Sequence, residues 1–353
     1  MTGPTPTDNV AATLTAAELE AVAQLLRGID PALVPGTLSA SLLSGGRSNL
    51  TFRLDTGGVP LVLRRPPLGH VLATAHDMGR EYQVMAALHP TGYPVPRMIC
   101  HIEDSDVLGT PFYVMELIDG TVYRQLDDLS SLKPEEAQAL SFSFIDALAD
   151  LHLVDYQKVG LENFGRPNGY LERQVRRWVG QAESPTAREL DGWHELGSRL
   201  SASVPTAARS TIVHGDFRLD NAVVDSADPG RVRAVLDWEM STLGDPLSDL
   251  GLFYLYWQGW SGLDNPIAAT PADVPGYPSW ETLAERYAER TGTQLHHFSW
   301  YRAFAILKFT VICEGIHYRY SQGLTVGPGF ERIGQLVPPL IQRGLTILDD
   351  AND

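Results

Sequence analysis

Cysteine is scarce in this sequence, with Cys100 and Cys313 as the only two in 353 residues. Two cysteines so far apart make no disulfide framework and supply too few thiolates for a structural zinc site, so the reducing cytoplasm fits best. The sequence also has no run of about 18 apolar residues of the kind that spans a membrane. Its first residues lack the basic start and apolar stretch of a secretory signal, so we expect neither a membrane span nor export.

Basic residues are also few, with 27 Lys and Arg against 43 Asp and Glu and a formal net charge of −16 at pH 7. Such an acidic chain is not expected to bind nucleic acid or an anionic membrane non-specifically. Hydrophobic residues make up 44% and charged residues 20%, which is the balance of an ordinary globular protein. A chain of this length is too long for one simple core, so we expect two lobes.

Several well-known site motifs are missing. The sequence has no GxxxxGK[ST] loop, no GxGxxG opening a βαβ unit and no HExxH, which argues against P-loop, Rossmann and zincin sites. Ser130 and Lys133 match the pattern SxxK, but neither SDN nor KTG accompanies them, so a β-lactamase-like nucleophile is disfavoured.

The N-terminal third is expected to be mostly antiparallel sheet. Thr15 and Glu18 form a capping-box pattern that predicts a helix directly after a flexible arm. Strand patterns and turn signals then predict three strands within 37–65, a helix over 75–88 and a buried strand within 111–120.

The pattern changes to mainly helical beyond about residue 120. Helices are predicted over 134–155, 171–182, 186–201 and most of the chain after 246. Three short strands interrupt them, at 211–213, 222–225 and 232–237. The sequence therefore predicts an α+β chain with an N-terminal lobe at 1–118 and a helical C-terminal lobe at 119–353, which carries hairpins and an acceptor pocket.

Two of these hairpins carry an unusual set of polar residues. Asp216 and Asn221 lie in the turn of HGDFRLDN, and Asp237 ends the following strand. Carboxylate and amide oxygens suit Mg²⁺, which takes few protein ligands and completes its shell with phosphate oxygens. A further carboxylate can orient and deprotonate an attacking hydroxyl. These residue types at this spacing favour phosphoryl transfer, with Asp216 as the base and Asn221 and Asp237 as metal ligands.

The segment His214-Gly215-Asp216 with Asn221, followed by a strand ending in Asp237, resembles the aminoglycoside phosphotransferase and choline kinase family. Gly244-Asp245-Pro246 with Asp249 is also typical of it, and the resemblance covers about residues 38–320. It implies a two-lobed protein-kinase-like fold and phosphorylation of a small-molecule hydroxyl with ATP and Mg²⁺. His214 is expected to be structural, and Asp245 and Asp249 to brace the loop and cap a helix.

The same resemblance implies a nucleotide site in the N-terminal lobe. Four features would occur in order along the chain: a phosphate loop, a cation on the third strand, an acidic partner on the next helix, and a linker strand whose backbone binds adenine. The matching residues are Gly45, Gly46, Ser48 and Asn49, then Val62 and Arg64, then Glu81, then Glu116 and Ile118.

Arg64 departs from the family pattern, which has Lys at this place, and Arg and Lys are not interchangeable. Arg65 beside it is a competitor for the same role. The run LRRPP resembles a subgroup, the kinase-like domains fused to acyl-CoA dehydrogenases, and this argues against an aminoglycoside acceptor. A nucleotide-binding module without transfer activity is the alternative to an active kinase.

The acceptor is expected to bind in the helical lobe, where aromatic residues gather. Candidate lining residues are Trp257, Trp260, Glu314, His317 and Tyr318. Such an apolar-aromatic lining suits an acyl acceptor such as a hydroxyacyl thioester better than a polycationic sugar. The alternative is that these residues pack in the core, as residues at helical spacing usually do. No feature of the sequence specifies an oligomeric state.

Overall fold

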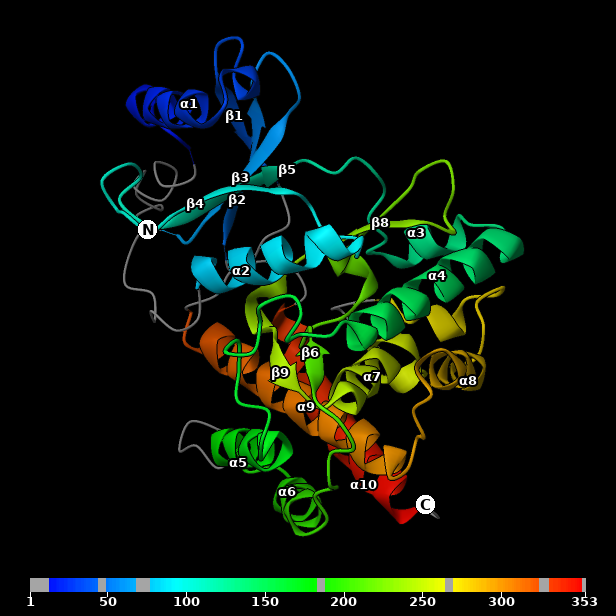
Figure 1. Ribbon diagram of the computed structural model, residues 1–353. Coiled ribbons are helices and arrows are strands. Elements are labelled where there is room, and N and C mark those ends of the chain that lie inside the picture. The colour runs from blue at the N-terminus through cyan, green and yellow to red at the C-terminus, as the bar shows by residue number, and fades with distance from the viewer. Residues whose placement is uncertain are drawn as a thin grey trace. The chain divides into compact units, whose positions relative to one another are not determined.

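The structure is a computed structural model, and it describes residues 13–43, 49–67, 77–182, 188–263, 269–323 and 330–350 (Figure 1). The chain divides into two compact units. The first comprises residues 1–119 together with Asp237–Glu239, and the second comprises Gly120–Leu236 and Met240–Asp353. The sequence predicts a single division near residue 118 and gives no sign that Asp237–Glu239 belongs to the first unit.

The first unit is built on a five-stranded antiparallel sheet with the order β1-β2-β3-β5-β4. Its strands are β1 (Ser39–Leu42), β2 (Leu50–Asp55), β3 (Leu61–Arg65), β4 (Met98–Ile102) and β5 (Phe112–Glu116). Its helices are α1 (Ala16–Ile29) and α2 (Met78–Leu88). The predicted capping box is confirmed, because the Thr15 hydroxyl accepts from the Glu18 N–H while the Glu18 carboxylate accepts from the Thr15 N–H.

One face of this sheet forms an apolar core with α1. Leu61 and Leu63 of β3 meet Phe112 and Val114 of β5 and the buried side of α1 there. Because side chains alternate along a strand, the residues between them point to the other face. This alternation places Arg64 of β3 beside Tyr113 of β5, its register partner, on the face opposite the apolar core.

The described residues of the second unit are mainly helical and include four short strands, as Figure 1 illustrates. Its helices are α3 (Leu126–Ser130), α4 (Pro134–Leu153), α5 (Tyr170–Ala182), α6 (Trp193–Ala202), α7 (Pro246–Tyr254), α8 (Trp280–Thr291), α9 (Phe298–Ser321) and α10 (Phe330–Asp349). Its strands are β6 (Thr211–Val213), β7 (Ala222–Val224), β8 (Val232–Val235) and β9 (Thr242–Gly244). The strands β7 and β8 form the expected antiparallel hairpin. The expected hairpin between β6 and β7 is wrong, because β6 pairs instead with β9, a strand that the sequence does not predict.

The prediction of a helix over 186–201 is wrong at its beginning. The helix α6 begins at Trp193, because Gly192 before it has a φ of +79°, a left-handed conformation that ends any continuous helix. Tyr256, Trp257 and the residues around them form a single π-turn, Leu255–Gly259, after α7. Such turns are often found at functional sites.

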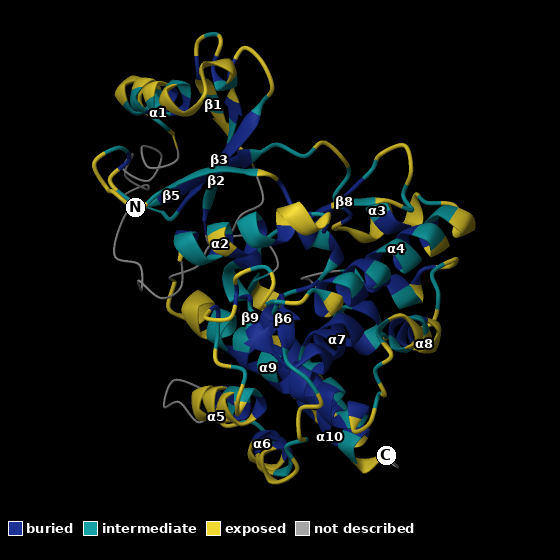
Figure 2. Ribbon diagram, viewed as in Figure 1, coloured by how far each residue is buried: buried dark blue, intermediate teal, exposed yellow. Residues whose placement is uncertain are grey.

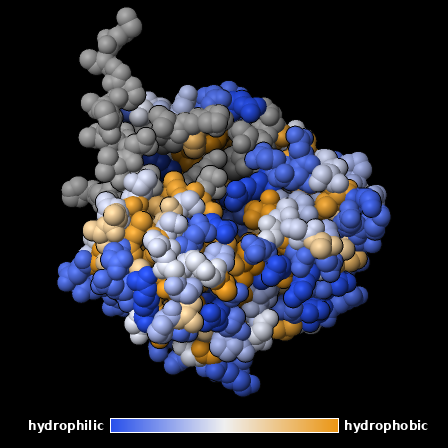
Figure 3. All heavy atoms as spheres, turned by 90° about the horizontal axis from the view of Figure 1, so that it is seen from above, coloured by the Kyte–Doolittle hydropathy of each residue, from blue (hydrophilic) through white to orange (hydrophobic). Residues whose placement is uncertain are grey.

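The core of the second unit lies around α7, the N-terminal part of α9 and the β6–β9 pair, which are mostly buried (Figure 2). The apolar side chains that remain exposed are distributed over different elements, among them Ile29, Val59, Leu126 and Tyr318. Hydrophilic and apolar residues are accordingly interspersed on the face shown in Figure 3. Within the described residues, no helix combines the length and apolar character that crossing a membrane requires.

Candidate active site

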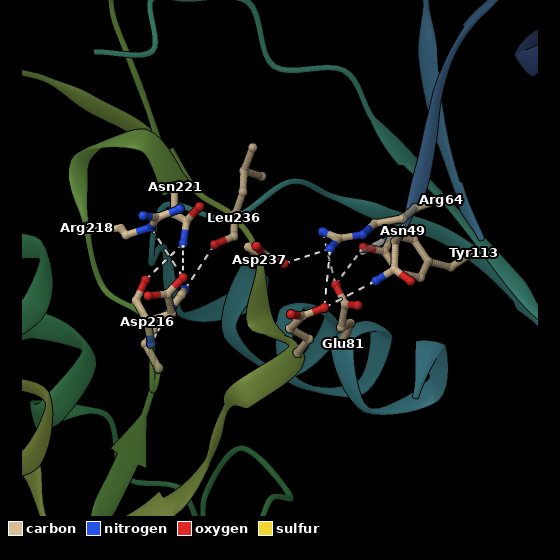
Figure 4. Close-up of polar contacts among 11 residues, drawn as sticks. Asn49, Arg64, Glu81, Tyr113, Asp216, Arg218, Asn221, Leu236 and Asp237 are labelled. Atoms are coloured by element: carbon tan, nitrogen blue, oxygen red, sulfur yellow. Dashed lines mark hydrogen bonds and ion pairs between the residues drawn. The ribbon is translucent and has the colours of Figure 1, made fainter. Parts of the chain in front are cut away.

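Arg64 of β3 is surrounded by carboxylates within the first unit (Figure 4). One guanidinium nitrogen, NH1, lies 3.3 Å from Oε2 of Glu81 in α2. The other, NH2, lies 2.6 Å from Oδ1 of Asp237 and 3.9 Å from Oε2 of Glu239. The pairing of Arg64 with Glu81 that the sequence predicts is therefore present, and two further carboxylates join it.

Arg65 occupies a different environment, although it follows Arg64 directly. Its guanidinium lies 5.7 Å from the ring centre of Phe52 and donates to the carbonyl of Leu108 at 3.4 Å. Its nearest carboxylate is that of Glu18 in α1, 4.0 Å away. Of the two arginines, it is thus Arg64 that meets Asp237 and Glu239.

The pKa of Glu81 reflects this crowded environment. Its side chain is fully buried, and its pKa is raised to about 7, mainly by burial and in addition by the negative charges of Asp237 and Glu239. The Arg64 charge and a hydrogen bond from the Tyr113 hydroxyl act in the opposite direction. Burial disfavours the charge of Arg64 as well, but Tyr113, Glu81 and Asp237 together raise its pKa above the ordinary value, so its charge is secure.

Asp237 itself has an uncommon backbone conformation. Its φ is +66°, in the left-handed region that non-glycine residues rarely adopt. The next residue, Trp238, is fully buried and packs edge-on against Tyr93, with ring centres 6.1 Å apart. The packing of Trp238 holds the backbone that directs the Asp237 carboxylate toward Arg64. Strained backbone of this kind is concentrated at functional sites.

The loop that carries Asp216 is held from several sides within the second unit. Asp249 of α7 accepts the N–H of His214 through Oδ2 at 2.5 Å and the N–H of Gly215 through Oδ1 at 2.8 Å. The His214 ring donates from Nε2 to the carbonyl of Leu236 at 3.0 Å, and its Nδ1 accepts the N–H of Asp216 at 3.2 Å. The predictions that His214 is structural and that Asp249 braces the loop are confirmed.

Further support for this loop comes from buried polar side chains that the sequence does not reveal. Lys308 of α9 donates to the Gly215 carbonyl at 2.7 Å, and burial lowers the pKa of its ammonium group. His152 of α4 contacts Oδ2 of Asp249 at 3.4 Å and the Tyr287 hydroxyl at 2.7 Å. Burial raises the pKa of Asp249, but its hydrogen bonds and the neighbouring His152 outweigh this and hold it below the ordinary value.

Three side chains contact the Asp216 carboxylate, two through hydrogen bonds and one through an ion pair, and Figure 4 labels two of them, Asn221 and Arg218. Tyr256 in the π-turn donates its hydroxyl to Oδ1 at 3.2 Å. Asn221 donates its amide to Oδ2 at 3.0 Å, and Nε of Arg218 lies 3.3 Å from the same oxygen. The carboxylate is one quarter exposed, so it is both fixed in orientation and open to solvent.

Asn221 and Asp237 have the chemistry of magnesium ligands. The Asn221 amide nitrogen is engaged with Asp216, so its oxygen is the atom available to a cation. Asp237 offers a carboxylate, which is likewise a hard oxygen ligand of the kind that Mg²⁺ accepts. Their role as metal ligands stays a prediction. In the part of the chain that the structure describes, no group of three or more His, Cys, Asp or Glu side chains forms a metal cage.

The other predicted nucleotide residues lie in unit 1 or outside the described residues. Gly45, Gly46 and Ser48 fall outside them. Asn49 is buried and donates to Oε2 of Glu239 at 3.3 Å. Val62 is buried in β3 opposite Met115, and Glu116 and Ile118 lie at and just beyond the end of β5. Their contacts with a nucleotide stay a prediction.

The residues predicted to line an acceptor pocket are used mainly for packing. Trp257 is buried, donates to the Pro278 carbonyl and stacks on Phe253. Trp260 is fully buried, with its ring 4.5 Å from that of Phe309. The core-packing alternative therefore describes both tryptophans.

The remaining three acceptor candidates lie on α9. Glu314 forms a bidentate ion pair with Arg188, whose Nε lies 2.9 Å from Oε1 and whose NH2 lies 2.7 Å from Oε2. The His317 ring occupies the space into which a Cβ added at Gly334 of α10 would project, and Tyr318 is 37% exposed. Their role in binding an acceptor stays a prediction.

A different pocket lies beside Asp216 in the second unit. Arg218 and Tyr256, which both contact Asp216, form part of its wall. Its full lining is Tyr123, Arg124, Leu129, Arg218, Leu219, Asp220, Tyr256, Ala269 and Pro271. None of the five predicted acceptor residues is among these. Arg218 lies inside the motif HGDFRLDN and could have been selected from it, whereas nothing distinguishes Tyr256 from the aromatic residues around it.

The fold and the hairpin residues together define a kinase-like phosphotransferase. The chain belongs to the phosphotransferase enzyme family, whose model matches residues 39–300. A crystal structure from Ralstonia eutropha, provisionally described as an aminoglycoside phosphotransferase, is 32% identical with a TM-score of 0.82, and the match covers 95% of this chain and 99% of that one. Choline kinase from Cryptosporidium parvum shares the fold, with a TM-score of 0.63 at 12% identity over 94% of this chain and 96% of that one.

A curated relative extends this picture to longer proteins. Human acyl-CoA dehydrogenase family member 11 is 34% identical over 314 residues, which cover 88% of this chain and 40% of the relative. The chain thus spans about 40% of the length of this relative. The predicted resemblance to kinase-like domains fused to acyl-CoA dehydrogenases is confirmed.

Proposed function

We propose that the protein transfers the γ-phosphoryl group of ATP to a hydroxyl group of a small molecule. The observation that carries this proposal is the environment of Asp216, a partly exposed carboxylate fixed by Tyr256, Asn221 and Arg218. A carboxylate oxygen can accept two hydrogen bonds, so Oδ1 can accept one from an acceptor hydroxyl in addition to that from Tyr256. Asp216 would thereby orient the hydroxyl and take its proton as the bond to phosphorus forms.

Arg64 and the metal ligands are proposed to act on the nucleotide phosphates. Asn221 and Asp237 would hold Mg²⁺, which when bound neutralises charge on the phosphate oxygens. Arg64 would donate its guanidinium to phosphate oxygens while Glu81 keeps it oriented. The Leu236 carbonyl accepts a hydrogen bond from His214, and Asp237, the next residue, supplies the carboxylate beside Arg64.

The pocket lined by Arg218 and Tyr256 is the proposed entrance for the acceptor. Its lining includes the guanidinium groups of Arg124 and Arg218 against the single carboxylate of Asp220. Arg218 pairs with Asp220 at 2.9 Å and with Asp216 at 3.3 Å, so its charge is compensated. Arg124 adds a further positive charge to the lining, and this charge favours an acceptor that carries an anionic group, such as a hydroxyacyl thioester with an anionic carrier, over a polycationic aminoglycoside.

The experiment is a phosphoryl-transfer assay with acceptor panels. The protein is incubated with ATP and Mg²⁺ and either aminoglycosides or hydroxyacyl thioesters, and phosphorylated products are identified by mass spectrometry and ³¹P NMR. The proposal expects a phosphorylated hydroxyacyl thioester. Product from aminoglycosides alone would contradict the acceptor class. Tight binding of ATP without turnover of any hydroxyl compound would favour the binding module instead.

A further inference from the structure

Tyr113 is a fully buried tyrosine whose hydroxyl has a specific polar partner. It lies in the middle of β5, opposite Arg64 in the register of the sheet. Its hydroxyl donates to Oε2 of Glu81 at 3.0 Å, and this is the same oxygen that lies 3.3 Å from NH1 of Arg64 (Figure 4). A fully buried tyrosine hydroxyl requires such a partner, but a phenylalanine would fill the same apolar space without one.

The Glu81 carboxylate depends heavily on this hydrogen bond. Its second oxygen, Oε1, is buried and has no hydrogen-bond partner. Oε2 therefore carries both of the donor contacts that fix the group, one from Tyr113 and one from Arg64. Without the tyrosine hydroxyl, only the contact with Arg64 would orient the Glu81 side chain. Glu81 could then no longer serve as a fixed support for Arg64.

Two carboxylates hold the Arg64 guanidinium from different sides. Its NH2 group lies 2.6 Å from Asp237, and its NH1 group lies 3.3 Å from Glu81. If Glu81 is not held in place, the guanidinium is fixed mainly through Asp237, the proposed metal ligand. Its orientation toward the phosphates would then be less well defined.

We infer that Tyr113 is a positioning residue for nucleotide binding: it holds Glu81, and Glu81 together with Asp237 fixes the orientation in which the Arg64 guanidinium meets the phosphates. This inference rests on the proposed function, in which Arg64 meets the nucleotide. Tyr113 itself touches neither substrate, so its contribution is transmitted only through Glu81 and Arg64.

The test is a double-mutant cycle on nucleotide binding. The affinity for ATP with Mg²⁺ is measured by calorimetry for the unchanged protein, Tyr113→Phe, Arg64→Met and the double variant. Loss of a hydrogen bond to a charged group corresponds to about a tenfold loss of affinity, which we expect for Tyr113→Phe in the presence of Arg64. In the Arg64→Met background we expect the same substitution to change the affinity by less than about twofold, because the residue through which it acts is gone.

Two further variants separate positioning from a general loss of stability. Tyr301→Phe removes a hydrogen bond of the same kind, from a buried tyrosine hydroxyl to Oδ2 of Asp245 at 2.8 Å, in the second unit. It should leave nucleotide affinity unchanged. Glu81→Gln retains the shape of the side chain and should reproduce the loss seen in Tyr113→Phe, with no further loss when the two are combined.

The inference is overturned if Tyr113→Phe binds ATP as tightly as the unchanged protein. It is equally overturned if the loss is as large without Arg64 as with it, because this would be a merely structural effect. Failure of the unchanged protein to bind ATP would instead refute the proposed function, and the inference with it.

Discussion

Asp249→Asn tests how the loop before the proposed catalytic base is held in place. Each oxygen of the Asp249 carboxylate accepts one backbone N–H, from Gly215 at Oδ1 and from His214 at Oδ2. An asparagine has only one such oxygen, so in either orientation its amide nitrogen faces a backbone N–H and leaves that buried donor unpaired. An unpaired buried donor costs about 1–3 kcal/mol, and the remaining hydrogen bond loses its ionic character at about 1 kcal/mol more. We expect the loop to become about 3 kcal/mol easier to open.

Hydrogen–deuterium exchange of peptides covering residues 211–216 measures this opening directly. A change of about 3 kcal/mol corresponds to roughly a hundredfold loss of protection for these amides. Asp225→Asn is the matched control, because Asp225 accepts a backbone N–H from Ala227 in an exposed turn of the same region. That variant should change protection of the same peptides by less than about threefold. Equal protection in Asp249→Asn and the unchanged protein would refute the account of how this loop is held.

Two further predictions concern pH and the loop glycine. Because the pKa of Glu81 is raised from 4.5 to about 7 in the folded protein, the folded state holds an extra proton between these values. The contribution of Glu81 to the free energy of unfolding is therefore fully present below pH 4.5. It falls by up to about 3 kcal/mol as the pH rises to about 7. Urea unfolding of Glu81→Gln should lack this slope, and parallel pH profiles for the two proteins would contradict the prediction. Gly215→Ala should reduce transfer activity strongly, because at a φ of +82° an added Cβ would lie 2.7 Å from the Met240 carbonyl oxygen. Gly92→Ala has the same φ but open space, so it should cost only about 1–2 kcal/mol of stability and retain activity; equal activity in the two variants would show that the close approach is harmless.

The elements with strong local signals could be predicted from the sequence. The capping box of Thr15 and Glu18 and the strands within 37–65 follow from residue types a few positions apart. In contrast, β4 and β9 were not foreseen. β4 is half-buried along its length and shows no clear alternation, and β9 is a three-residue strand defined only by its pairing with β6. Tertiary contacts, which local patterns do not contain, determine both.

The sequence likewise predicts some residues of the candidate site and misses others. Asp216, Asn221 and Asp237 could be predicted as site residues because their residue types and their spacing between short strands indicate a chemistry. Tyr113 and Lys308 come from strands and helices far along the chain, and they gain polar roles only when folding brings them to Glu81 and Gly215. For the aromatic residues Trp257 and Trp260 the sequence pattern was not sufficient, because it cannot distinguish a pocket lining from a packed core.

The central claim is that Asp216 accepts the proton of the acceptor hydroxyl during phosphoryl transfer. The most direct measurement compares kcat for transfer from ATP, and the affinity for ATP with Mg²⁺, between the unchanged protein and Asp216→Asn. The account predicts that kcat falls by about 10² to 10⁴ while nucleotide affinity stays within about twofold. Transfer at an undiminished rate by Asp216→Asn would contradict it.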